Sequence, residues 1–184
     1  VQNIDGTVSA ENNWWGCNSG PGAGGAGCSG TANGTIGTVD ASPWLTLRTT
    51  ATPSSILTGG TSSISSNLNF NSDNVDTSGL GSVPNGTPAS FAATLGTVSP
   101  TSGTTAAGVT GTTFTAGIAA GSGNAATTID GQTVNAPITI AFSCNNISIP
   151  TGQTVGTNTQ FLVPINIDDT TARGILGYSF TLSY

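Results

Sequence analysis

The chain has 184 residues, of which only 5% are charged, against about 25% in an average soluble domain. Its formal net charge is −6, its only cations are Arg48 and Arg173, and it contains no Lys, His or Met. Because two cations cannot neutralise a phosphate backbone or hold the chain on an anionic bilayer, the composition argues against nucleic-acid binding and electrostatic membrane attachment.

Residues 1–50 hold all three tryptophans of the chain. Trp14 and Trp15 lie in an Asn-Asn-Trp-Trp-Gly stretch, and Trp44 lies in Val-Asp-Ala-Ser-Pro-Trp-Leu. This pair of motifs resembles the C-terminal end of right-handed parallel β-helices in secreted and surface-anchored bacterial and archaeal proteins. The resemblance implies a terminal coil and its cap over residues 1–50, with a cap core of Trp14, Trp15, Trp44 and Leu45. The alternative is a Trp-containing loop of some other β domain.

A single β-helix coil cannot be stable alone, because each coil buries its apolar face only against its neighbours. The opening residues 1–8 fit one coil, and neither a signal peptide nor an earlier coil precedes them. We therefore expect a processed or internal piece of a larger exported protein, or a second copy that supplies the missing surface.

Cys17 and Cys28 flank a Gly-rich loop. In an extracellular protein they would form a disulfide that orders this loop, and free thiols are the alternative. A zinc site is disfavoured because the chain has neither His nor a C-x-x-C pair. Cys144 is left over, either as a small buried hydrophobe or as a cross-link between copies.

Residues 51–141 alternate short apolar runs with turn signals. Ile64, Leu68 and Phe70 recur at period two, which predicts one buried strand face. Asn85-Gly86 and Asp130-Gly131 are turn dipeptides, and the strand spacing predicts a β-sandwich.

The stretches Gly-Thr-Pro-Ala-Ser-Phe (86–91), Ala-Thr-Leu-Gly-Thr-Val-Ser-Pro (93–100) and Asp-Gly-Gln-Thr-Val (130–134) resemble bacterial Ig-like domains of the invasin and intimin type. That family uses such domains as spacers and adhesive stalks, without catalytic residues.

Residues 142–184 resemble the opening strands of a cohesin-like jelly roll, which reads V-P-I-x-I-D-D-T and then G-I-x-x-Y-x-F-T-L-x-Y. Most strands of such a sandwich are absent here, so its apolar faces would need a neighbouring chain to cover them by strand addition. The candidate inter-subunit strand residues are Phe161, Val163, Ile165, Leu176, Tyr178, Phe180 and Leu182.

Catalysis is disfavoured, because nucleophile–base chemistry usually needs His and phosphoryl transfer needs a Lys-bearing loop. Asp168 and Asp169 could bind calcium, but a turn with hydrogen-bonded carboxylates is the simpler interpretation, also for Asp73 and Asp76. We therefore expect no cofactor.

The sequence predicts an all-β extracellular structural protein of the cell surface in three parts, residues 1–50, 51–141 and 142–184. Its expected role is a stalk, sheath or filament subunit that joins copies end to end. The alternative is an adhesin or carbohydrate-binding module for a glycan or matrix ligand, with the tryptophans as contacts.

Overall fold

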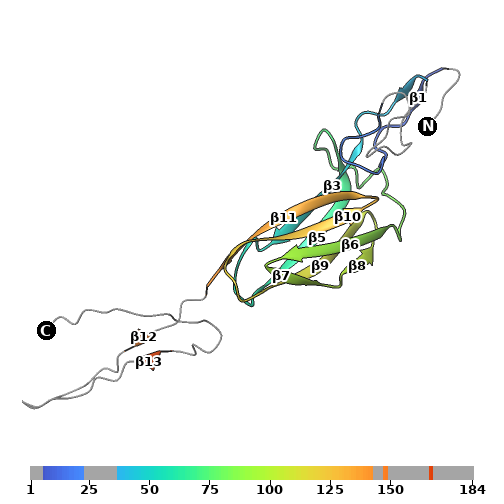
Figure 1. Ribbon diagram of the computed structural model, residues 1–184. Coiled ribbons are helices and arrows are strands. Elements are labelled where there is room, and N and C mark those ends of the chain that lie inside the picture. Colours follow the sequence, from blue (N-terminus) through green and yellow to red (C-terminus); the bar gives the residue numbers. More distant parts are fainter. Residues whose placement is uncertain (1–5, 23–36, 143–146, 149–165, 168–184) are drawn as a thin grey trace, which may run out of the picture. The chain divides into compact units, whose positions relative to one another are not determined.

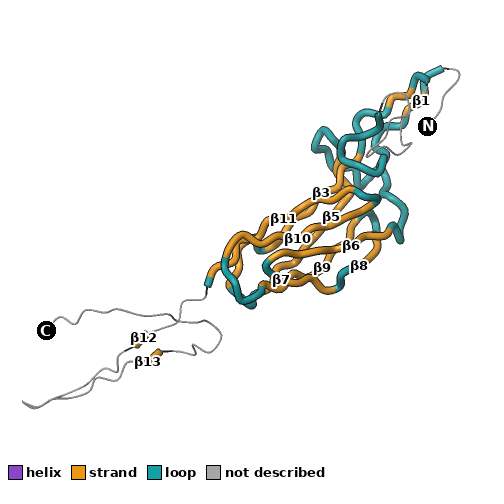
Figure 2. Tube along the Cα trace, viewed as in Figure 1, coloured by secondary structure: helices purple, strands orange, loops and turns teal. Residues whose placement is uncertain are grey.

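The computed structural model describes residues 6–22, 37–142, 147–148 and 166–167 (Figure 1). The chain divides into two compact units, Val1–Ala141 and Phe142–Tyr184. Every regular element among the described residues is a strand, so the predicted all-β class is confirmed (Figure 2).

Residues 45–141 form an Ig-like β-sandwich of two sheets. One sheet has the strand order β4-β11-β10-β6-β8, and the other has the order β3-β5-β9-β7. The bounds are β3 (Leu45–Thr52), β4 (Ser55–Leu57), β5 (Thr61–Asn71), β6 (Pro88–Thr94), β7 (Gly96–Ser99), β8 (Ser102–Thr104), β9 (Val109–Ala116), β10 (Gly121–Ile129) and β11 (Gln132–Ala141). Strand β3 runs across residue 50, where the sequence places a boundary, and the division into three domains stays a prediction.

The core lies between the two sheets and follows the period of two. Along β9 every second side chain is buried, and Phe114 is fully enclosed. Each large apolar side chain buried in this way contributes roughly 1.5–3 kcal/mol. The Leu, Ile and Phe members of this core are Leu45, Leu47, Ile56, Ile64, Leu68, Phe91, Phe114, Ile129, Ile138 and Ile140.

A polar link crosses this apolar core. The hydroxyl of Ser66 on β5 lies 2.7 Å from that of Thr127 on β10, and neither residue is exposed. Ser66 also hydrogen-bonds Thr49 of β3 at 3.1 Å. The link satisfies both hydroxyls and joins the two sheets, since β5 and β10 belong to different layers.

Phe70 departs from the predicted buried face. Ile64 and Leu68 are buried as expected, but Phe70 is only half-buried and Asn71 is buried instead. The cause is a register shift between Thr46 and Arg48 in the pairing of β3 with β5. One extra residue on one strand of a pair breaks the alternation locally, which period counting cannot detect.

Both predicted turns are confirmed. Asp130 and Gly131 have φ angles of 50° and 84° and connect the paired residues Ile129 and Gln132. Positive φ at both central positions is the geometry of a type I′ hairpin turn. Gly86 has φ 89° in the turn that precedes β6.

The segment before the sandwich contains one short parallel pair. Strand β1 (Val8–Ser9) pairs with β2 (Val39–Asp40), in the register Val8 to Val39. Parallel pairing is what a β-helix coil would show, but a β-helix needs stacked coils, so the implied terminal coil stays a prediction.

In the second unit, β12 (Ile147–Ser148) pairs with β13 (Asn166–Ile167) in antiparallel fashion. The seven candidate inter-subunit residues lie outside the described residues, as do Asp168, Asp169 and Cys144. The cohesin-like sandwich and the end-to-end assembly therefore stay predictions.

Candidate functional site

The functional candidates gather where residues 10–20 meet the end of the sandwich. Asn18 makes the central contact. Its Nδ2 donates to the carbonyl of Leu47 at 2.9 Å, and its Oδ1 accepts from the Leu47 N–H at 2.7 Å. Its own backbone N–H donates to Oε1 of Gln132 on β11 at 2.9 Å.

Leu47 needs these two bonds because β3 is the outermost strand of its sheet, and Leu47, like Leu45, turns its backbone groups away from β5. It has no partner in the pairing of β3 with β5, and its side chain is 1% exposed. Buried backbone N–H and C=O groups must be paired, or they lose their hydrogen bonds to water without compensation. The carboxamide of Asn18 presents one donor and one acceptor side by side, so it replaces the missing strand partner.

The tryptophans belong to the same junction. The Trp14 indole N–H donates to Oδ2 of Asp130 at 2.8 Å, and the ring packs against the sandwich core. The Trp44 indole N–H donates to the carbonyl of Asn18 at 3.0 Å. A Cβ on Gly20 would lie 2.5 Å from the Trp44 ring, so only glycine allows this close approach.

Further bonds tie the two chain segments together. The N–H of Asn12 donates to the carbonyl of Pro43, and the N–H of Leu45 donates to the carbonyl of Asn13. Nδ2 of Asn71, at the end of β5, donates to Oδ1 of Asn12 at 2.9 Å. Residues 12–18 are thus held by hydrogen bonds to β3, β5, β11 and the β10–β11 turn.

The predicted cap residues lie as follows. Leu45 is buried in the sandwich core, Trp15 is buried, and Trp14 and Trp44 are half-buried. Because the contacts of Trp14 and Leu45 run to the sandwich, a role in covering a β-helix end stays a prediction. Cys17 is buried, but its predicted disulfide partner Cys28 lies outside the described residues, so that pairing also stays a prediction.

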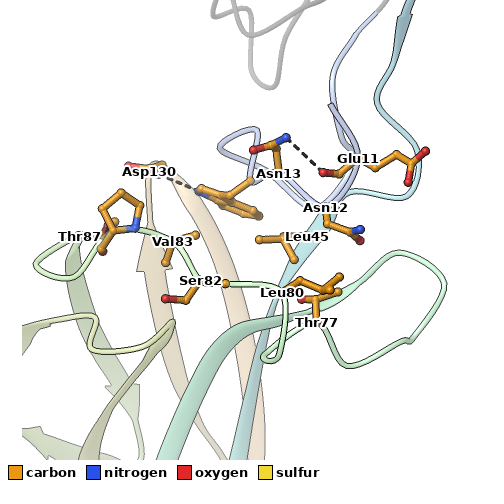
Figure 3. Close-up of a pocket in the computed structure, with 13 residues that line it drawn as sticks. Glu11, Asn12, Asn13, Leu45, Thr77, Leu80, Ser82, Val83, Thr87 and Asp130 are labelled. Atoms are coloured by element: carbon orange, nitrogen blue, oxygen red, sulfur yellow. Dashed lines mark hydrogen bonds between the residues drawn. The ribbon is translucent and has the colours of Figure 1, made fainter. Parts of the chain in front are cut away.

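A pocket of about 680 Å³ lies at this junction (Figure 3). Residues 11–14 form one wall and residues 77–87 form another, with Leu45 between them and Asp130 at one side. Figure 3 shows Asp130 and Glu11 on opposite sides of the pocket. The lining residues are Glu11, Asn12, Asn13, Trp14, Leu45, Thr77, Leu80, Gly81, Ser82, Val83, Pro84, Thr87 and Asp130.

The carboxylate of Asp76 stabilises a local turn. The backbone N–H of Ser78 donates to Oδ1 of Asp76 at 2.8 Å. This bond and one from the Ser78 side chain lower the pKa of Asp76 below its ordinary value of 3.8. The turn interpretation of Asp76 is therefore confirmed. Within the part of the chain that the structure describes, no three His, Cys, Asp or Glu side chains gather as a metal site would require.

No protein-family model and no curated protein matches the chain. Among solved structures, the adhesin InvE of Yersinia pseudotuberculosis is 23% identical with a TM-score of 0.43, and the match covers 59% of this chain and 31% of InvE. A C-terminal fragment of intimin was solved in complex with the intimin-binding domain of its translocated receptor. It is 16% identical with a TM-score of 0.44, and the match covers 67% of this chain and 44% of the fragment. A glycosyl hydrolase family 2 member from Bacteroides cellulosilyticus is 14% identical with a TM-score of 0.46, and the match covers 57% of this chain and 15% of the hydrolase.

These similarities concern the fold of the sandwich, and they assign no activity, ligand or partner. The chain spans less than half the length of each of the three structures. InvE and intimin belong to the group that the motifs of residues 51–141 resemble. Across the described residues, no helix is long and apolar enough to cross a bilayer.

Three residues of the junction, Asn18, Asn71 and Asp130, were not predicted from the sequence. Asp130 was assigned only to a turn, and Asn18 and Asn71 were assigned to no site. The one available signal was Asn18 itself, a residue with both a donor and an acceptor beside a tryptophan pair. Its partner Leu47 lies 29 residues away, a separation that local patterns do not reach.

Proposed function

We propose that this chain is a load-bearing spacer module of a cell-surface adhesin. The observation that carries the proposal is the parallel pairing of β4 with β11 in a sandwich whose chain enters at one end and leaves at the other. The motifs shared with invasin- and intimin-type domains support the adhesin context.

The two ends of the sandwich are defined by contacts. Strand β3 begins at Leu45, near Asn13 and the β10–β11 turn, whereas β11 ends at Ala141, whose carbonyl accepts from Thr58. Figure 1 shows these points at opposite ends of the sandwich. Tension on the chain therefore acts along the strands.

The β4–β11 pair meets this tension in shear. Ser55, Ile56 and Leu57 pair in parallel with residues 139–141. Two further backbone hydrogen bonds flank the pair: the N–H of Thr139 donates to the carbonyl of Ser54 at 2.8 Å, and the N–H of Thr58 donates to the carbonyl of Ala141 at 2.9 Å. Pulling β4 from its N-terminal end and β11 from its C-terminal end loads these bonds together, whereas a hairpin would open one bond at a time.

The junction of residues 12–18 extends this rigidity toward the N-terminus. Asn18 connects to both sheets, through Leu47 of β3 and Gln132 of β11, and Trp14 connects to Asp130. A preceding segment held by several hydrogen bonds transmits force and orientation better than one on a flexible linker. Such a joint suits a stalk that must project a binding surface away from a cell.

Single-molecule force spectroscopy tests the load-bearing role. The chain should resist more force when pulled from its two ends than when pulled through handles on the β10–β11 hairpin. Thr139→Pro removes the N–H that donates to Ser54, so it should lower the end-to-end unfolding force.

Val98→Ala is the matched control, since Val98 is buried on β7, outside the loaded pair. It should reduce thermal stability with a smaller loss of unfolding force than Thr139→Pro. Equal forces in both pulling directions, or no force loss in Thr139→Pro, would contradict the proposal.

The surface location is tested separately. An antibody raised against residues 45–141 should label intact cells of the source organism. Labelling only after the cells are opened would contradict the adhesin context without affecting the mechanical result.

A further inference from the structure

We propose that the pocket between residues 11–14 and residues 77–87 binds a neutral saccharide. The spacer function does not require this site, because its main support is the β4–β11 pair, whereas the pocket lies where residues 11–14 meet the sandwich. The inference follows from the size of the pocket, the chemistry of its lining and the placement of its charges.

The size and shape suit a small ligand or the end of a longer one. The volume of about 680 Å³ lies inside the range of roughly 300–1,000 Å³ typical of small-molecule sites. Leu80 lines the pocket and is 77% exposed, so the rim is accessible from solvent. Val83 and Leu45 are buried and provide an apolar floor.

The lining combines apolar surface with hydrogen-bonding groups. The Trp14 indole is half-buried and supplies an aromatic surface, held by its bond to Asp130. Within the described part of the chain, the hydrogen bonds engage Oδ2 of Asp130 and Nδ2 of Asn13, so the second carboxylate oxygen of Asp130 and the side-chain carbonyl oxygen of Asn13 remain as acceptors. A sugar presents both matching surfaces, a C–H face for aromatic and aliphatic side chains and hydroxyls for carboxylate and amide oxygens.

The charges of the lining disfavour acidic ligands. Neither Lys nor Arg lines the pocket, while Glu11 and Asp130 do, so an acidic ligand such as a phosphate or a sialylated glycan would be repelled. The two carboxylates lie on opposite sides in Figure 3, and no three His, Cys, Asp or Glu side chains of the described residues gather as a metal site would require. A neutral ligand with many hydroxyls satisfies this arrangement best.

The test is a glycan array probed with the full chain, followed by titration calorimetry of the oligosaccharides that bind. The array carries neutral oligosaccharides of galactose, glucose, mannose and N-acetylglucosamine, with matched sialic-acid and uronic-acid forms. A Lys- and Arg-rich peptide serves as the cationic probe. We expect binding to at least one neutral oligosaccharide, weaker binding to its acidic form and no binding to the peptide.

Two conservative variants locate the site. Leu80→Ala removes an exposed rim side chain, and Asp130→Asn keeps an acceptor for the Trp14 indole while removing the charge. Each should weaken binding about tenfold, the effect of one well-placed contact, with an unchanged melting temperature. Ile118→Ala is the matched control, because Ile118 is 79% exposed but lies in the β9–β10 loop at the other end of the sandwich.

Several outcomes would overturn the proposal. They are the absence of any bound neutral oligosaccharide, stronger binding to acidic forms, binding of the basic peptide alone, and equal affinity in Leu80→Ala, Asp130→Asn and Ile118→Ala. Trp14→Phe gives a second check, since it keeps an aromatic surface and should retain more affinity than Trp14→Ala.

Discussion

Replacement of Asn18 by alanine should weaken the attachment of the N-terminal segment to the sandwich without unfolding the sandwich. The substitution removes the carboxamide that pairs with both backbone groups of Leu47, at 2.7 and 2.9 Å. The backbone bond from Asn18 to Gln132 would remain, so the effect isolates the side chain.

The magnitude follows from the burial of Leu47. A buried polar group that loses its partner costs about 1–3 kcal/mol, and two groups of one residue lose theirs together. Since the truncated side chain leaves room for some water to reach them, we expect a loss of about 2–4 kcal/mol in the free energy of unfolding. That is a large share of the roughly 5–15 kcal/mol of a typical domain.

Urea unfolding with two probes measures this effect. Tryptophan fluorescence reports the junction, because all three tryptophans lie in residues 14–44, and circular dichroism reports the sandwich strands. The two transitions should coincide in the native chain and separate in Asn18→Ala, with fluorescence changing at lower urea. Asn124→Ala is the control, since Asn124 bonds only an exposed partner, Asn135, and should change stability by less than about 0.5 kcal/mol. Coincident, unshifted transitions in Asn18→Ala would refute the role assigned to its side chain.

Three further substitutions test the core, the junction and the acid response. Ser66→Ala should reduce the free energy of unfolding by about 1–3 kcal/mol, because the buried Thr127 hydroxyl loses its hydrogen-bond partner. The double variant Ser66→Ala, Thr127→Val should recover most of this loss. Additive losses in thermal denaturation would argue against the inter-sheet bond. Gly20→Ala should lower the free energy of unfolding more than Gly86→Ala does. Both glycines have positive φ, but only a Cβ at residue 20 would clash with an indole ring. Equal losses in urea unfolding would mean that backbone strain alone causes the destabilisation. The pKa of Asp76 is lowered by hydrogen bonds, so its stabilisation is present above its ordinary pKa of 3.8 and is lost as the pH falls through the lower folded value. The difference in melting temperature between native chain and Asp76→Asn should therefore shrink on acidification, and a constant difference would contradict that assignment.

The amino-acid sequence by itself determined the class of the fold. Alternating apolar residues such as Ile64 and Leu68 sit on one face of a strand whatever their partners are, because successive side chains of a strand point to opposite sides. Asp130-Gly131 specifies a hairpin because both positions must adopt positive φ. These properties are local, so they can be predicted without knowing how the strands are arranged.

The tertiary structure alone decided the junction and the pocket. Trp14 meets Asp130 across 116 residues of sequence, and Asn18 meets Leu47 at the open edge of β3. The register shift between β3 and β5 moves Phe70 out of the core and beneath Arg48, whose guanidinium carbon lies 4.4 Å from the ring centre. Such contacts depend on which strands become neighbours and in which register. That choice is made by packing the whole core at once, and no local pattern of residue types records it.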